Sequence, residues 1–114
     1  QRANRPTLLL IDDEPQYREA MVRLLAGRFD VRVAQDLATG MRFLEDASAP
    51  VDLILCDIVM PDGGAPRLRE ELAASRPELL SRLVFITQNL PRDVIEEGLA
   101  AFLQAADALS EAGA

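Results

Sequence analysis

Acidic side chains and one hydroxyl stand at the ends of three short apolar runs in this sequence. Asp12 and Asp13 follow the first run, Asp57 lies near the end of a second, and Thr87 ends a third. If these runs are neighbouring parallel strands, their carboxyl ends meet at one edge of a sheet, where ligand sites of open α/β sheets form. The sequence therefore predicts one pocket with three carboxylates and a hydroxyl.

Carboxylates that lie this close repel one another, so the pocket needs protons or a shared cation. Mg²⁺ fits, because it takes oxygen ligands in an octahedron and keeps several waters. Asp13 and Asp57 are predicted to bind the ion directly and Asp12 through a water, with the backbone carbonyl of Val59 completing the set. A carboxylate beside Mg²⁺ can attack a phosphoryl group and carry it as an acyl phosphate. The Thr87 hydroxyl would then donate a hydrogen bond to a phosphoryl oxygen.

Each of these residues, taken alone, has an ordinary structural explanation. The Asp12-Asp13 pair is typical of a loop and a helix cap, Asp57 of a turn, and Thr87 of a strand residue with its methyl group in the core. Their joint occurrence at the ends of three strand patterns is much harder to attribute to chance. The combination therefore favours a functional pocket.

Composition excludes several other kinds of chemistry. The 114 residues are enough for about one domain, and the net charge of −7 argues against direct contact with nucleic acid. The chain contains no histidine and one cysteine, which excludes His-dependent catalysis, His-ligated zinc and an internal disulfide. No apolar run approaches the roughly 20 residues that span a bilayer. Residues 1–6 carry no hydrophobic signal region, so a cytoplasmic protein with a disordered N-terminal segment is predicted.

Four strand patterns alternate with helix patterns along the chain. The predicted strands are residues 7–11, 30–34, 51–58 and 83–87. Helices are predicted to begin at Pro15, after Asp36 and at Pro66. Between the third strand and the third helix, Asp62 is expected to serve a turn and Gly63 to take a left-handed conformation. Right-handed crossovers then predict a doubly wound α/β fold, a parallel sheet between two helix layers, over residues 7–114.

The segment after Thr87 allows two interpretations. Apolar residues from Val94 to Leu109 keep helical spacing, which favours one long helix beginning near Pro91. Alternatively, the helix breaks at Gly98, residues 100–103 form a short fifth strand, and residues 105–111 form a truncated last helix. With four strands, the sheet would expose an edge unless a partner chain covers it.

Three segments together resemble bacterial response-regulator receiver domains. They are the opening Leu8–Pro15, the loop Asp57–Gly64 and the strand Val84–Thr87. The resemblance covers about residues 7 to 90 and implies a flavodoxin-like sheet in the order 2-1-3-4-5. It implies Asp57 as phospho-acceptor, Asp12 and Asp13 as the Mg²⁺ site, and Thr87 as the switch residue. It also implies a phosphohistidine donor on a sensor histidine kinase or a phosphotransfer protein.

The sequence departs from the family pattern at its C-terminal end. Receiver domains carry a lysine after the fifth strand, whereas this chain contains no lysine. Ala105 and Ala106 are the candidate remnant of that Lys-Pro pair, and Phe102 is either the family's switch aromatic or a core residue of a helix. Arg92 is a poor replacement for the lysine because guanidinium is larger and planar. Gln88 is bulkier than the small residue usual after the switch threonine.

These observations favour a receiver domain that is phosphorylated on Asp57 with Mg²⁺. The alternative is a pseudo-receiver, in which the same fold serves as an interaction or dimerisation module through the apolar stretch from Leu99 to Leu109. A haloacid-dehalogenase-like phosphohydrolase is disfavoured because Val59 stands where such enzymes need a second aspartate. A nucleotide-binding domain is disfavoured because acidic residues replace the glycine-rich phosphate loop.

Overall fold

Four parallel strands form the sheet at the centre of the molecule. The computed structural model describes residues 5–46, 48–86, 91, 93–95, 97–101 and 104. The strands lie in the order β2-β1-β3-β4. They are β1 (Thr7–Ile11), β2 (Asp30–Ala34), β3 (Leu53–Asp57) and β4 (Leu83–Ile86). All three pairings are parallel, which confirms the predicted sheet and the order of its first four strands.

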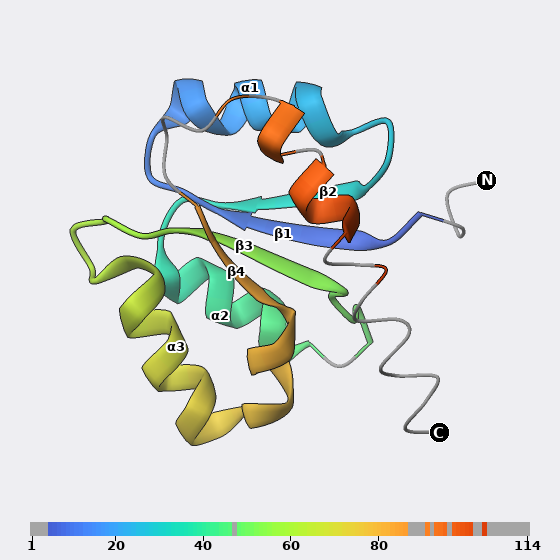
Figure 1. Ribbon diagram of the computed structural model, residues 1–114. Coiled ribbons are helices and arrows are strands. Elements are labelled where there is room, and N and C mark those ends of the chain that lie inside the picture. Colours follow the sequence, from blue (N-terminus) through green and yellow to red (C-terminus); the bar gives the residue numbers. More distant parts are fainter. Residues whose placement is uncertain are drawn as a thin grey trace.

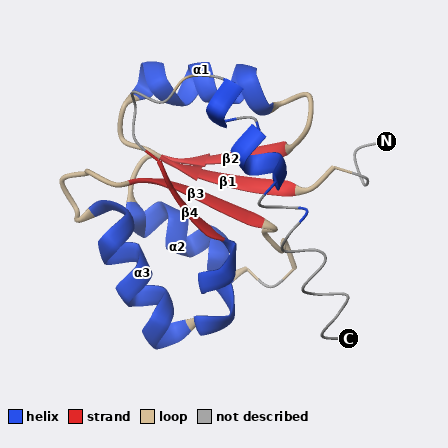
Figure 2. Ribbon diagram, in the orientation of Figure 1, coloured by secondary structure: helices blue, strands red, loops and turns tan. Residues whose placement is uncertain are grey.

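Helices cover both faces of this sheet. They are α1 (Pro15–Leu25), α2 (Leu37–Glu45) and α3 (Gly64–Ser75), and a 3-10 helix, η2 (Pro77–Arg82), follows α3. Helix α1 lies on one face, and α2 and α3 lie on the other (Figures 1 and 2). The predicted three-layer α/β architecture is therefore confirmed.

Alternating side chains of the two central strands supply the cores of the two layers. Leu8 and Leu10 of β1 pack on the α1 side, whereas Leu9 and Ile11 pack on the side of α2 and α3. Strand β3 repeats the pattern, and Cys56 belongs to the α2 and α3 side. All of these side chains are buried, as expected of a strand with helices on both faces.

Side chains cap the first two helices. The carboxylate of Glu14 accepts a hydrogen bond from Gln16 N at the start of α1, and that of Asp36 accepts one from Thr39 N at the start of α2. Helix α3 begins at Gly64, two residues before the predicted start at Pro66. Pro66 is tolerated there because the first amides of a helix have no intrahelical acceptor. The third strand is also shorter than the predicted residues 51–58.

The described residues from 93 onward are helical. Residues 93–95, 97–101 and 104 are helical, and Ile95 N donates to the carbonyl of Pro91. Ile95 and Leu99 are buried in the core on the α1 side. The fifth-strand interpretation is therefore wrong for Ala100 and Ala101. The remaining residues of these predictions, Phe102, Leu103, Ala105, Ala106 and 107–111, lie outside the described residues.

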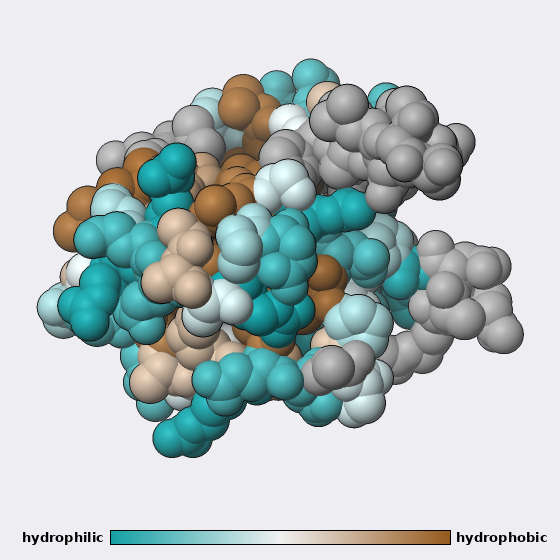
Figure 3. Space-filling view, turned by 90° about the horizontal axis from the view of Figure 1, so that it is seen from below, coloured by the Kyte–Doolittle hydropathy of each residue, from teal (hydrophilic) through white to brown (hydrophobic). Residues whose placement is uncertain are grey.

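Hydrophilic residues cover much of the surface on the side of α2 and α3, and hydrophobic areas show between them (Figure 3). No helix in the described ranges combines the length and apolar character that crossing a membrane requires. Four large hydrophobic side chains of the described residues are exposed, namely Val33, Val59, Phe85 and Val94.

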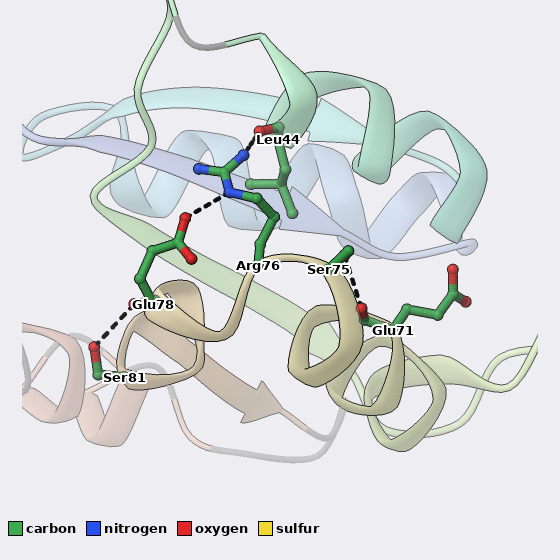
Figure 4. Close-up of polar contacts among 6 residues, drawn as sticks. All are labelled: Leu44, Glu71, Ser75, Arg76, Glu78 and Ser81. Atoms are coloured by element: carbon green, nitrogen blue, oxygen red, sulfur yellow. Dashed lines mark hydrogen bonds and ion pairs between the residues drawn. The ribbon is translucent and has the colours of Figure 1, made fainter.

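Arg76 joins the two helices on that side of the sheet. Its Nη1 donates to the backbone carbonyl of Leu44 at 2.6 Å, near the end of α2, and its Nε donates to Glu78 at 2.6 Å (Figure 4). Arg76 is the residue between α3 and η2. One guanidinium therefore fixes the α3–η2 junction against α2.

We expect Arg76→Met to lower the free energy of unfolding by about 1–2 kcal/mol, because the Leu44 carbonyl loses a charged donor. Urea unfolding followed by circular dichroism measures this change. Glu78→Gln is the control, and it should change stability little because an exposed ion pair contributes little. Equal losses in the two variants would show that the contact with Glu78, rather than the link to α2, stabilises the junction.

Candidate functional site

The adjacent ends of β1 and β3 bring three acidic side chains together. Ile11 pairs with Cys56 in the sheet, so Asp12 and Asp57 follow directly on neighbouring strands. Carboxylate oxygens of Asp12, Asp13 and Asp57 lie within 4.8 Å of one another. Asp12 and Asp57 are buried, whereas Asp13 is exposed to solvent. The cluster is thus open on one side and closed toward the sheet.

One carboxylate oxygen of Asp12 lacks a hydrogen-bond partner among the described residues. Its side chain is fully buried, and Oδ1 accepts a hydrogen bond from Glu14 N at 2.8 Å. Oδ2 is buried without a hydrogen-bond partner among the described residues. Burial raises the pKa of Asp12 to about 6, and the nearby carboxylates of Asp57 and Asp13 add to this shift. A buried oxygen without a partner, beside two further carboxylates, fits a divalent cation with oxygen ligands.

The loop after β3 holds Asp57 in place. Asp57 Oδ1 accepts a hydrogen bond from Val59 N at 3.2 Å. The amide of Val59, rather than its carbonyl, makes this contact, and the Val59 side chain is 79% exposed. The role of the Val59 carbonyl as a metal ligand stays a prediction. The structure therefore places the backbone of residue 59 beside the acidic cluster.

Two glycines allow this loop to turn into α3. Gly63 and Gly64 have φ values of 112° and 64°, which confirms the left-handed conformation predicted for Gly63. A Cβ atom on Gly64 would lie 2.2 Å from the carbonyl oxygen of Ile58 and 3.0 Å from that of Asp57. The first residue of α3 thus packs directly on the backbone of the acidic strand end.

Two neighbours of the cluster were not assigned to the site from the sequence. Tyr17 of α1 is half-buried, and its pKa is raised to about 12, first by burial and then by the carboxylates of Asp12 and Asp57. Arg18 donates from Nη1 to the backbone carbonyl of Asp12 at 2.8 Å. The sequence showed only helical spacing for Tyr17 and no signal for Arg18. Their approach to the cluster depends on how α1 lies across the end of β1.

Comparison with known proteins decides the family. The model of the response regulator receiver domain matches residues 8–110. The chain belongs to this family. Receiver domains are signalling phospho-acceptors of two-component systems. They are phosphorylated on an aspartate, bind Mg²⁺ at an acidic pocket and interact with histidine kinases or phosphotransfer proteins.

Individual relatives agree with this assignment. The receiver domain is 30% identical over 96 residues to the sensor kinase CckA of Brucella abortus (strain 2308), covering 76% of this chain and 10% of that protein. It is 34% identical over 84 residues to the DNA-binding transcriptional regulator NtrC of Rhizobium meliloti (strain 1021), covering 73% of this chain and 17% of that protein. It therefore spans a small part of these relatives.

A solved structure shows the same fold. The signal receiver domain of a LuxO repressor protein from Vibrio parahaemolyticus superposes with a TM-score of 0.80 at 14% identity, covering 96% of this chain and 98% of that chain. Thr87, Gln88 and Arg92 of this receiver domain lie outside the described residues, so the predicted switch hydroxyl is not placed. Within the described part, Arg18 is the cationic residue that contacts the backbone of the acidic cluster.

Proposed function

We propose that residues 7–114 form a receiver domain in which Asp57 accepts the phosphoryl group. Asp12, Asp13 and Asp57 would hold Mg²⁺, with the Val59 carbonyl as a further ligand, and Thr87 would donate to a phosphoryl oxygen. The observation that carries this proposal is the cluster of three carboxylates within 4.8 Å, which includes the unpartnered Oδ2 of Asp12.

The donor is a phosphohistidine that lies outside these 114 residues, because none of them is a histidine. A carboxylate oxygen of Asp57 attacks phosphorus, and the phosphorus–nitrogen bond of the donor breaks as the new phosphorus–oxygen bond forms. The electron pair of the broken bond leaves with the imidazole nitrogen. A histidine kinase or a phosphotransfer protein is the partner that this chemistry requires.

The residues of the chain prepare Asp57 for this attack. The Val59 amide fixes Oδ1, which leaves Oδ2 of Asp57 as the oxygen to attack phosphorus. Asp12 and Asp13 would bind the cation, and Arg18 holds the backbone of Asp12. Bound Mg²⁺ supplies positive charge that offsets the carboxylates and the phosphoryl oxygens.

Acetyl phosphate with Mg²⁺ tests the proposal directly. Wild-type protein is expected to gain the mass of one phosphoryl group, about 80 Da, and Asp57→Asn is expected to gain none, because its amide is a poor nucleophile. Intact-protein mass spectrometry measures both, and omission of Mg²⁺ should suppress the gain. A gain that persists in Asp57→Asn, or no gain with either acetyl phosphate or a cognate kinase, would contradict the proposal.

The lack of lysine favours a second candidate, the pseudo-receiver that acts without phosphorylation. Loss of one member of a desolvated charge pair costs about 2–5 kcal/mol, which would weaken coupling between the phosphoryl group and the last helix. This candidate predicts a homodimer or a stable complex in the absence of a phosphoryl donor. Sedimentation over a concentration series tests it, and a monomer at all concentrations would count against dimerisation.

A further inference from the structure

Asp62 connects the loop after β3 to a different part of the fold. Its Oδ2 accepts a hydrogen bond from Leu37 N, the first residue of α2, at 2.8 Å, and its Oδ1 accepts a longer one from Gly64 N at 3.5 Å. Leu37 is 25 residues away in the sequence. A carboxylate at the start of a helix is favoured by unpaired amides and the helix dipole. Asp62 therefore bonds to α2 as well as to the turn that it was expected to serve.

The loop that carries this carboxylate is linked to Asp57 through its backbone. Val59 N contacts the Asp57 side chain, Met60 is 7% exposed, and Gly63 N donates to the carbonyl of Met60. Gly64 leaves no room for a Cβ atom against the carbonyl of Ile58. A displacement of Asp62 would therefore also move the backbone next to Asp57.

The start of α2, which carries Leu37, is linked to the β1 side of the acidic cluster. Asp12 N donates to the carbonyl of Ala34 at the end of β2. Helix α2 begins three residues after Ala34, at Leu37. The end of β2 therefore links Asp12 to the start of α2. The hydrogen bond between Leu37 and Asp62 then connects the start of α2 to the loop that follows Asp57.

We propose that Asp62 is a positioning residue for the phosphoryl-accepting site. By binding the α2 amide, it holds the loop of residues 58–63 so that Asp57 and the backbone of Val59 face Asp12. This inference rests on the proposed function and adds to it the residue that sets the geometry of the loop. Asp62 itself belongs to neither the carboxylate cluster nor the proposed set of metal ligands.

The matched control for Asp62→Ala is Asp36→Ala. Asp36 caps the same helix through Thr39 N at 2.8 Å, and this hydrogen bond stays within the first turn of α2. If Asp62 merely stabilised α2, both substitutions would act alike. Under the proposal, Asp62→Ala weakens Mg²⁺ binding and slows phosphorylation by acetyl phosphate by roughly tenfold each, as is usual when a residue that orients metal ligands is removed. Asp36→Ala leaves both close to wild type, and Asp62→Asn, which keeps an acceptor oxygen, restores most of the loss.

Mg²⁺ affinity is measured without turnover, from the rise in melting temperature with Mg²⁺ concentration. The fluorescence of Tyr17, the one tyrosine in a chain without tryptophan, gives an independent titration. If Asp62→Ala does not fold, Asp62→Glu replaces it. That variant keeps the charge but moves the carboxylate by one methylene, and its affinity is expected to fall several-fold.

The outcomes separate this inference from the proposed function. If wild-type protein neither binds Mg²⁺ nor gains mass, the proposed function fails first. If wild-type protein does both, equal behaviour of Asp62→Ala and Asp36→Ala overturns the role of Asp62. If Asp62→Ala does not fold, a wild-type Mg²⁺ affinity in Asp62→Glu likewise overturns the role of Asp62.

Discussion

Gly64→Ala is expected to destabilise this receiver domain by about 2–5 kcal/mol. The left-handed conformation costs an L-residue about 1–2 kcal/mol, and forced overlap in a packed region costs about 1–3 kcal/mol more. Both apply, because φ is 64° and the new Cβ atom would lie 2.2 Å from a backbone oxygen that cannot rotate away. Urea unfolding monitored by circular dichroism measures the loss.

Gly27→Ala is the matched control for this experiment. Gly27 lies in the turn after α1, has no positive φ, and a Cβ atom there would meet nothing within 4 Å. Its substitution should be neutral or slightly stabilising, since alanine reduces the freedom of the unfolded chain. A Gly64→Ala variant as stable as Gly27→Ala would show that the start of α3 can move away from Asp57 at little cost.

Asp12→Asn is expected to stabilise the protein without Mg²⁺ at neutral pH and to remove its response to Mg²⁺. The folded pKa of Asp12, about 6, lies above the ordinary value of 3.8, so the folded state binds more protons between these values. Stability contributed by this group is present at low pH and is lost as pH rises through about 6. The shift corresponds to at most about 3 kcal/mol at pH 7 and above.

The measurement compares the two proteins in chelator at pH 5 and pH 7.5. The stability advantage of Asp12→Asn should grow with pH, whereas adding Mg²⁺ should raise the melting temperature of wild type alone. Asp36→Asn is the control, because hydrogen bonds with Thr39 lower the pKa of Asp36 below its ordinary 3.8, so the effect of this substitution should not change between pH 5 and pH 7.5. An advantage of Asp12→Asn that does not change with pH would show that folding does not raise the pKa of Asp12.

The sequence was sufficient to predict the acidic cluster because strand order and apolar runs determine it. The continuous apolar segments of β1 and β3 indicate buried neighbours, and side chains that follow neighbouring parallel strands must meet. The start of α2 after Asp36 was also predictable, because the cap that Asp36 forms is a contact between residues three apart. Apolar runs and helix caps can be predicted from the sequence because each depends on residues that are close together in the chain.

Contacts across the fold were not predictable in this way. The bond between Asp62 and Leu37 depends on how the loop after β3 passes the end of β2, and no local pattern encodes it. The early start of α3 at Gly64 depends on a close approach to Ile58 that only the packed loop creates. The choice between helix and strand for residues 100–103 was open because short apolar runs fit both periods.

The reactivity of Cys56 can report how often the folded protein opens. The thiol is fully buried beside Asp57, and burial together with the charges of Asp57, Asp62 and Asp12 raises its pKa to about 12. Only the thiolate reacts readily with alkylating reagents, so native molecules should resist labelling and each labelled molecule records one excursion from the closed state. Because this is the single cysteine, the labelling rate reports how often β3 becomes exposed to solvent. A ligand that binds the carboxylate cluster and stabilises the folded state should slow that rate.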